Sequence, residues 1–255
     1  MTWSMGSGLE GKGVIVTGAA GGIGREVARA FAAAGAQVAA VDLREEPVKE
    51  LVASLGKGSH LALCADLRDI GGHEALLQTV RQRFGTLDVL AHVAGVLIRR
   101  KHVDEVTEAD WDLQHDVNLK ATFFLNRAVA RICLQQGRGG RIINFTSQGW
   151  WTGGFGGSVV YAATKGGIVS LTRGLARTYA KDRITVNAVS PGAVDTEMLF
   201  NDLSQEQIDQ MVAQIPIGHV AAPTDLAGAV IFLASDHASY VTGATINVSG
   251  GWLMY

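Results

Sequence analysis

Short apolar runs alternate along the chain with longer segments that have helical periodicity. The apolar runs lie at residues 14–16, 37–41, 60–64, 87–93, 141–145, 184–189 and 244–248. Between most of them, apolar residues recur at three- and four-residue spacing, which is typical of helices with one buried face. Apolar strands alternating with helices predict a Rossmann-like α/β fold, with a doubly wound parallel sheet of about seven strands and helices on both faces.

The helices are expected at residues 22–34, 47–55, 72–84, 109–135, 159–180 and 226–233. The long segment 109–135 is expected to bend near residues 116–118, where a new apolar face begins. No linker, low-complexity stretch or charge block divides the chain, so residues 1–255 are interpreted as one domain. Residues 194–217 have only a weak helical pattern and are interpreted as a lid-like insertion.

Composition narrows the function classes. Hydrophobic residues make up 47% of the 255 positions, which excludes global disorder, and a net charge of -2 gives no reason to expect a nucleic-acid partner. No apolar run approaches the ~20 residues of a membrane span, and no signal peptide is expected. Cys64 and Cys133 are interpreted as reduced core residues of a cytoplasmic protein. Histidines and cysteines lack metal-ligand spacing, so no metal is expected.

Tyr161 and Lys165 are four residues apart on a predicted helix, so they share one face. A free tyrosine has a pKa of about 10, and a nearby ammonium favours the phenolate. Tyr161 is therefore a candidate general base toward an alcohol or general acid toward a ketone. An exposed tyrosine beside a solvated lysine gives the same short motif, so the interpretation depends on Ser147 as a third polar group and on a cofactor site.

A glycine-rich turn lies between the first predicted strand and helix. Gly18, Gly22 and Gly24 would let the backbone approach a pyrophosphate at a helix N-terminus, although their spacing is not that of the common dinucleotide fingerprint. Asp42 ends the second strand, where a carboxylate can bind ribose hydroxyls; a helix cap or turn residue is the alternative. Asp66 ends the third strand and could face an adenine or cap a helix.

Together these motifs resemble the short-chain dehydrogenase/reductase family over nearly the whole chain. The branch they are most similar to holds 3-oxoacyl-(acyl-carrier-protein) reductases and related NAD-dependent alcohol and sugar dehydrogenases. The matching positions are, in chain order, Thr17-Gly18, Gly22-Ile23-Gly24, Asp66-Leu67, Ala94-Gly95, Asn118, Ser147, Tyr161, Lys165, Asn187, Pro191-Gly192 and Thr196. The resemblance implies an NAD(P)-dependent enzyme acting on CH–OH groups, with a single dinucleotide-binding and catalytic domain.

The resemblance also implies roles for residues. Asn118, Ser147, Tyr161 and Lys165 would be catalytic: Ser147 orients the substrate oxygen, Tyr161 transfers the proton, Lys165 binds the nicotinamide ribose, and Asn118 holds a water in a proton relay. Asn118 could instead satisfy backbone at a helix kink, and Ser147 could be an ordinary serine at a strand end. The implied cofactor contacts are Gly18, Gly22, Ile23, Gly24, Asp42, Asp66, Leu67, Ala94, Gly95, Tyr161, Lys165, Pro191, Gly192 and Thr196.

The chain departs from the family pattern in three places. His92-Val93 stands where the family often has Asn-Asn, so the end of the fourth strand is expected to be held differently. Ser249-Gly250-Gly251 stands where Asp-Gly-Gly is usual. The spacing from Ser147 to Tyr161 is one residue longer than the commonest one, which makes Gln148 an alternative occupant of the serine's place.

Trp150, Trp151 and Phe155 follow Ser147 in a glycine-rich stretch and are interpreted, with Gln148, as a substrate wall; core packing is the alternative. They favour an apolar or ring-bearing substrate. The basic cluster at residues 99–101 is interpreted as a solvated loop, with anion binding as the alternative.

NAD is predicted as the cofactor, with NADP less favoured. The 2′-phosphate of NADP would bring negative charge close to the Asp42 carboxylate, and Arg44 is the one basic residue expected to reach it.

The leading function is the interconversion of a secondary alcohol and a ketone by hydride transfer. The alternatives are a 3-oxoacyl-thioester reductase and, from another class, a catalytically silent cofactor-binding regulator or scaffold. A homotetramer is expected, because two helices carry more apolar residues than one sheet face needs and residues 241–255 could form a second interface. Those apolar residues are Phe123, Phe124, Val129, Ile132, Leu171 and Leu175.

Overall fold

The structure, a computed structural model, describes residues 4–154, 156–201 and 203–255 and contains one seven-stranded parallel sheet. The strand order is β3-β2-β1-β4-β5-β6-β7. The strands are β1 (Gly13–Thr17), β2 (Gln37–Asp42), β3 (Leu61–Cys64), β4 (Val89–His92), β5 (Gly140–Phe145), β6 (Ile184–Pro191) and β7 (Thr245–Val248). All the expected strands are present, and the predicted fold class is confirmed.

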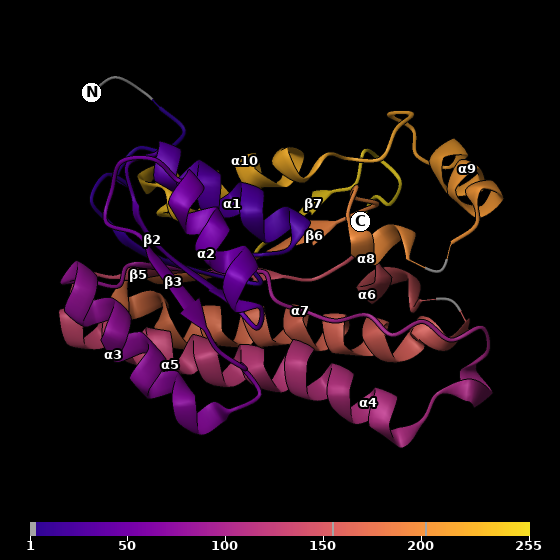
Figure 1. Cartoon of the computed structure of the whole chain (residues 1–255), viewed down its shortest axis with the longest axis horizontal. Coiled ribbons are helices and arrows are strands. Elements are labelled where there is room, and N and C mark those ends of the chain that lie inside the picture. Colours follow the sequence, from indigo (N-terminus) through magenta and orange to yellow (C-terminus); the bar gives the residue numbers. More distant parts are fainter. Residues whose placement is uncertain (1–3, 155, 202) are drawn as a thin grey trace.

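Helices cover both faces of the sheet (Figure 1). On one face lie α1 (Gly22–Ala33), α2 (Glu45–Ser54) and α10 (Pro223–Ala234), and on the other lie α3 (His73–Phe84), α5 (Ala121–Gln136) and α7 (Val159–Tyr179). Because the central strands are covered on both sides, their side chains are buried in both directions, which explains their unbroken apolar runs. Two large apolar clusters result, one under each helical layer.

The long helix predicted over residues 109–135 is interrupted where a bend was expected. α4 (Glu108–Gln114) passes into a π-helical segment, His115–Lys120, and then into α5. Asn118 is fully buried within this segment. A π-helical turn widens the helix locally and occurs frequently at functional sites, so this irregularity marks Asn118 for attention.

Other boundaries differ from the sequence prediction in ways that proline and glycine explain. α10 begins at Pro223, since proline is well suited to the first turn of a helix. β6 runs on through Pro191, which pairs with β7 beyond the end of the β5 ladder and so needs no N–H toward β5. The glycine-rich stretch after Ser147 contains a short helix, α6 (Gly149–Thr152).

The carboxyl ends of β1 and β4 meet where the strand order reverses, which is where ligands bind in open α/β sheets. Over this edge lies the segment 194–217, called here the lid segment, with α8 (Glu197–Phe200) and α9 (Gln205–Ala213). Figure 1 shows α6, α8 and α9 together at this side of the sheet. Residue 202 of the lid segment lies outside the described residues.

The cysteine prediction is half right. Cys133 is buried, but Cys64 is exposed and not a core residue, because it ends β3, the edge strand of the sheet. Among the described residues, no helix is long and apolar enough to cross a bilayer.

Candidate active site

The glycine turn has no room for side chains at two positions. Gly18 has φ +64°, and a Cβ there would lie 2.8 Å from Ala94 Cα. A Cβ on Gly24 would lie 2.1 Å from the Gly18 carbonyl oxygen. The close approach brings the N-terminus of α1 to the cavity edge, and Gly21 gives it no side-chain cap. Free N–H groups at a helix N-terminus bind phosphate well, so the turn fits the pyrophosphate of a dinucleotide.

Asp42 lies at the edge of the same cavity, at the end of β2. Its carboxylate accepts from the N–H of Ala20 at 2.9 Å and from the N–H of Arg44 at 3.2 Å. The Arg44 guanidinium lies 3.8 Å from this carboxylate and donates to the Ala20 carbonyl at 3.4 Å. Arg44, rather than Asp42, occupies the N-cap position of α2. Asp42 is therefore a fixed carboxylate in the cavity wall with a cationic neighbour.

Ser147, Tyr161 and Lys165 meet at the carboxyl end of β5. The Ser147 hydroxyl hydrogen-bonds the Tyr161 phenol and accepts from the N–H of Gly149 at 3.2 Å. Lys165 is buried, donates to the Phe145 carbonyl at 2.9 Å, and has its Nζ 5.5 Å from the centre of the Tyr161 ring. Ser147, and not Gln148, makes the hydrogen bond with the phenol.

Burial has the largest influence on the pKa values of Tyr161 and Lys165. It raises the pKa of Tyr161 to about 12, while the Ser147 hydrogen bond and the positive charge of Arg99 act to lower it. Burial also lowers the pKa of Lys165 to about 8. The expectation that Lys165 brings the pKa of Tyr161 below its ordinary value is wrong for the protein alone. Tyr161 carries its proton at neutral pH and Lys165 remains mostly charged.

The Asn118 side chain hydrogen-bonds neighbouring backbone and does not line the cavity. Its side-chain oxygen accepts from the N–H of Val96 at 2.8 Å, and its Nδ2 donates to the Val96 carbonyl at 2.9 Å and to Thr164 Oγ1 at 3.2 Å. Its main-chain carbonyl accepts from Thr122 Oγ1 at 2.5 Å. These contacts match the alternative reading, in which Asn118 satisfies backbone at a helix irregularity.

Asn118 is one rung of a ladder between the chain after β4 and the helix below it. Gln114 accepts from the N–H of Ile98 at 3.2 Å, and Asp110 binds the Arg100 guanidinium at 2.7 and 2.9 Å. The helix residues at 110, 114 and 118 are four apart in sequence, and their partners at 100, 98 and 96 are two apart. The polar ladder therefore ties residues 96–100 to α4 and the π-helical segment.

At His92-Val93, where the family often has Asn-Asn, other side chains make the contacts at the strand ends. Thr17 Oγ1 accepts from the N–H of Ala94 at 3.2 Å and lies 2.8 Å from His92 Nδ1. The histidine is buried, and burial, with Lys165 and His73 acting in the same direction, lowers its pKa to about 3. Thr17 and the neutral His92 thus hold the ends of β1 and β4 together where the family often uses asparagine.

One cavity of about 1170 Å³ joins the glycine turn to Tyr161. Most of the predicted site residues line it: Gly18, Gly22, Ile23, Gly24, Asp42, Ala94, Gly95, Ser147, Gln148, Tyr161, Lys165, Pro191, Gly192 and Thr196. The others do not. Asp66 forms an ion pair with Arg68 at 2.6 Å, Leu67 is a core residue, and Asn118 lies behind the wall.

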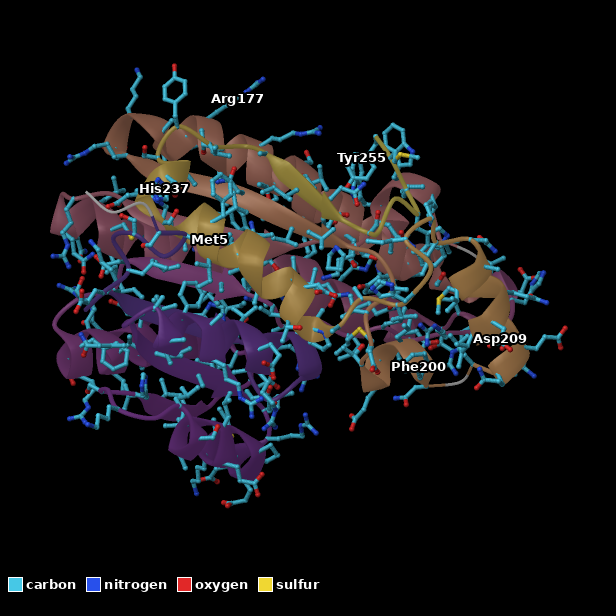
Figure 2. All side chains as sticks on the ribbon, turned by 90° about the horizontal axis from the view of Figure 1, so that it is seen from above. Met5, Arg177, Phe200, Asp209, His237 and Tyr255 are labelled. Carbon is cyan, nitrogen blue, oxygen red and sulfur yellow. The ribbon has the colours of Figure 1, made fainter. Side chains whose placement is uncertain are left out.

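The aromatic residues are arranged differently from the sequence prediction. Trp150 and Trp151 pack on Tyr255 instead of lining the cavity, with ring centres 4.8 and 5.5 Å from the tyrosine ring. Phe155 lies outside the described residues. Trp252 and Leu253 from the C-terminal tail line the cavity instead. Figure 2 shows Tyr255 at the same end of the molecule as Phe200 and Asp209 of the lid segment.

The lid segment supplies the remaining wall of this end of the cavity. The apolar residues that it contributes are Met198, Leu199, Leu203 and Met211. Arg99 also lines the cavity and donates to carbonyls of the lid segment, so the interpretation of residues 99–101 as a solvated loop is wrong for Arg99. No local pattern distinguishes Trp252 or Arg99, because both reach the site only through the tertiary fold.

Comparisons with known proteins agree with this site. A family model described as Enoyl-(Acyl carrier protein) reductase matches residues 18–253. The chain is 40% identical over 248 residues to 2-dehydro-3-deoxy-D-gluconate 5-dehydrogenase of Escherichia coli (strain K12), covering 96% of each chain. It is 38% identical over 249 residues to the 3-oxoacyl-(acyl-carrier-protein) reductase FabG of the same strain, covering 96% of this chain and 99% of the relative.

A solved structure from Beutenbergia cavernae, provisionally assigned as an NAD(P) dependent gluconate 5-dehydrogenase with NADP bound at low occupancy, has a TM-score of 0.88. It is 37% identical and covers 98% of this chain and 99% of that one. Because the dinucleotide bound in that structure is NADP, it gives no support for ranking NADP below NAD.

The fold, the glycine turn and the group formed by Ser147, Tyr161 and Lys165 are together typical of a dinucleotide-dependent oxidoreductase. The chain belongs to the short-chain dehydrogenase/reductase family, whose members use NAD(P) and act on CH–OH groups.

Proposed function

We propose that the chain interconverts a secondary alcohol and a ketone, with Ser147, Tyr161 and Lys165 as its catalytic residues and NAD as its preferred cofactor. The observation that carries this proposal is the convergence of the three side chains at one end of a cavity whose other end is the glycine turn. The nicotinamide supplies a hydride acceptor or donor when bound. Gly18, Gly24 and Asp42 at the far end fit its pyrophosphate and ribose.

In this proposal each of the three side chains has its own task. Ser147 holds the substrate oxygen beside the phenol with which it already shares a hydrogen bond. Tyr161 gives its proton to that oxygen during reduction and takes it back during oxidation. The Lys165 ammonium, held by the Phe145 carbonyl, favours the phenolate left after proton donation. Asn118 acts as a positioning residue that fixes Val96 and Thr164, rather than through a side chain in the cavity.

The preference for NAD rests on Asp42. Its carboxylate can accept hydrogen bonds from both ribose hydroxyls, whereas a 2′-phosphate would meet like charge. At 4 Å and an effective dielectric constant near 20, each pair of unit charges repels by roughly 4 kcal/mol before screening. The Arg44 guanidinium opposes this effect, because it lies beside Asp42 and faces the same cavity. Steady-state kinetics with both cofactors measure which residue dominates.

The substrate end favours a secondary alcohol with an apolar or ring-bearing body. Trp252, Leu253 and the lid methionines and leucines surround it, with Gln148 and Gln214 as the nearby amides. Burial of apolar surface stabilises a bound ligand by about 25 cal/mol per Å². Sugar acids and 3-oxoacyl thioesters, the substrates in the names of two relatives, are the alternatives to compare.

A single panel tests the proposed function. Purified protein is offered apolar secondary alcohols, polyols, sugar acids and a 3-oxoacyl thioester, with each cofactor in turn, and nicotinamide absorbance is followed. We expect turnover of apolar or cyclic secondary alcohols with NAD. Tight cofactor binding without turnover of any compound would favour the regulator or scaffold instead.

The assembly we propose is a homotetramer working in the cytoplasm. α5 and α7 form a shallow groove on their outer side, lined by Leu119, Phe123, Phe124, Gly167 and Leu171 among others. Apolar faces of this kind suit a two-fold interface between copies. Val129, Ile132 and Leu175 do not belong to this face, since they are buried in the core. Light scattering at micromolar concentration would give the mass of four chains, and a monomer mass would rule this proposal out.

A further inference from the structure

Arg99 joins two parts of the chain that are about a hundred residues apart in sequence. Its Nη1 donates to the carbonyl of Met198 at 3.1 Å and to the carbonyl of Asn201 at 2.7 Å. Met198 is a residue of α8 and Asn201 is its C-cap residue, so both carbonyls lie in the lid segment. Helix ends leave carbonyls without intrahelical partners, and cationic side chains stabilise them. Arg99 therefore supplies bonds that a helix as short as α8 cannot make for itself.

The backbone on both sides of Arg99 is held in place by hydrogen bonds of its neighbours. Arg99 lies between Ile98 and Arg100, two rungs of the polar ladder that tie residues 96–100 to Gln114 and Asp110. Leu97 and Arg99, which lie between the rungs, line the cavity, whereas Val96, Ile98 and Arg100 do not. The ladder thus presents alternate residues to the cavity from a fixed backbone.

The other end of α8 lies against the cofactor end of the cavity. A Cβ on Gly22 would lie 2.8 Å from Thr196 Cγ2, so the residue before α8 is packed against the glycine turn. Between this contact and Arg99, the side chains of Met198 and Leu199 line the cavity. α8 is therefore held at two points, and Arg99 provides the polar one.

We propose that Arg99 is a positioning residue that latches the lid segment over the substrate end of the cavity. With the latch made, Met198 and Leu199 form a fixed apolar wall. With the latch broken, the wall loses its position while Ser147, Tyr161 and Lys165 keep theirs. The kinetic part of this inference rests on the proposed oxidoreductase function, but the structural part does not.

Hydrogen exchange followed by mass spectrometry tests the latch without any substrate. Arg99→Met removes both bonds, Arg99→Lys keeps the charge but replaces the guanidinium with one compact ammonium, and Lys101→Met is the matched control. We expect amides of residues 197–201 to exchange about tenfold faster in Arg99→Met, which corresponds to about 1.4 kcal/mol. Arg99→Lys should fall between wild type and Arg99→Met, and Lys101→Met should match wild type. Unchanged exchange in Arg99→Met, with β4 and β5 still protected, would overturn the latch.

Kinetics then test what the latch does. With the substrate found in the panel, Arg99→Met should raise KM roughly tenfold, because the apolar wall is disturbed. Arg99→Lys keeps the positive charge that acts to lower the pKa of Tyr161, so a fall in kcat seen only in Arg99→Met reports that charge and not the wall. Arg99→Lys should recover part of the loss. Faster exchange with an unchanged KM would overturn the positioning role. A wild-type protein without turnover would contradict the proposed function, whereas the exchange experiment would still decide whether the latch exists.

Discussion

The two ends of the cavity are built in different ways. The cofactor end consists mostly of backbone: the glycine turn, the N-terminus of α1 and the ends of β1 and β2, with Asp42 as its main polar side chain. The substrate end consists of side chains from segments far apart in sequence, namely the lid segment, the loop after β4 and the C-terminal tail. The first end depends on the absence of side chains and the second on their identity. Variants should therefore affect one end and spare the other.

The largest effect is expected where the two ends meet. Tyr161→Phe keeps the ring but removes the transferable proton, so kcat should fall by ~10²–10⁴-fold while the cofactor Kd stays near the wild-type value. Tyr240→Phe is the matched control, since Tyr240 is fully exposed. Stopped-assay kinetics measure kcat, and cofactor fluorescence measures the cofactor Kd. More than about a tenth of wild-type kcat in Tyr161→Phe would remove Tyr161 from the mechanism.

Gly24→Ala should damage the cofactor end alone. Its Cβ would meet the Gly18 carbonyl at 2.1 Å, and overpacking of this kind costs about 1–3 kcal/mol. We expect the cofactor Kd to rise roughly tenfold to a hundredfold.

Gly228→Ala in α10 is the control, because no atom lies within 4 Å of the added Cβ. It should stabilise the fold by about 0.5–1 kcal/mol in a denaturation experiment. A Gly24→Ala protein that binds cofactor normally would show that the turn can widen without loss.

Asp42→Ala should change cofactor choice and leave the substrate KM unaltered. Removing the carboxylate removes its repulsion of a 2′-phosphate, so kcat/KM with NADP should improve about tenfold relative to NAD. Arg44→Ala should act in the opposite direction, since it removes the cation beside Asp42. Paired steady-state assays with both cofactors measure the ratio. Equal use of the two cofactors by wild type would show that Arg44 already offsets Asp42.

Trp252→Ala should affect only the substrate end. Its side chain lines the cavity and its indole N–H donates to Gln214 at 3.4 Å, so KM for an apolar substrate should rise by roughly fivefold to tenfold. Trp150→Ala is the comparison, because that ring packs on Tyr255 and does not line the cavity. A larger KM effect in Trp150→Ala would restore the sequence interpretation of the tryptophans.

The last prediction concerns the packing beneath the cofactor end. The pKa of His92 is lowered to about 3 in the folded protein, so between pH 6.5 and 3 the unfolded chain binds more protons there. This contribution to stability is full above pH 6.5 and is lost as the pH falls, by at most about 1.4 kcal/mol per pH unit. His92→Asn should flatten that part of the curve in urea denaturation at several pH values. Parallel curves would mean that the unfolded chain does not protonate His92 preferentially.

The same contrast explains how much the sequence could reveal. The sheet and the glycine turn are local features, because apolar runs and glycine positions record burial and close approach directly. Tyr161 and Lys165 were recoverable because they share a helix face, and Ser147, two residues beyond the end of β5, because the family resemblance implied its role.

The substrate end was not recoverable in the same way. Trp150 and Trp252 are both tryptophans near glycines, and only the fold directs one to Tyr255 and the other to the cavity. Asp42 is the last residue of β2, whereas Asp66 lies two residues beyond the end of β3 and its carboxylate binds the neighbouring Arg68. Burial also outweighed the expected influence of Lys165 on Tyr161, since solvation depends on every surrounding element.

In the polar ladder after β4, neighbouring positions have different roles. Residues 96, 98 and 100 hold the backbone to the helix, whereas 97 and 99 contribute side chains to the cavity. Natural variation or laboratory selection at 97 could therefore alter which substrates are accepted without disturbing the scaffold, whereas change at 99 would also loosen the lid segment. Substitutions at 110, 114 or 118 would destabilise the fold before they changed specificity. The segment is a place where this protein can acquire new specificity by small steps.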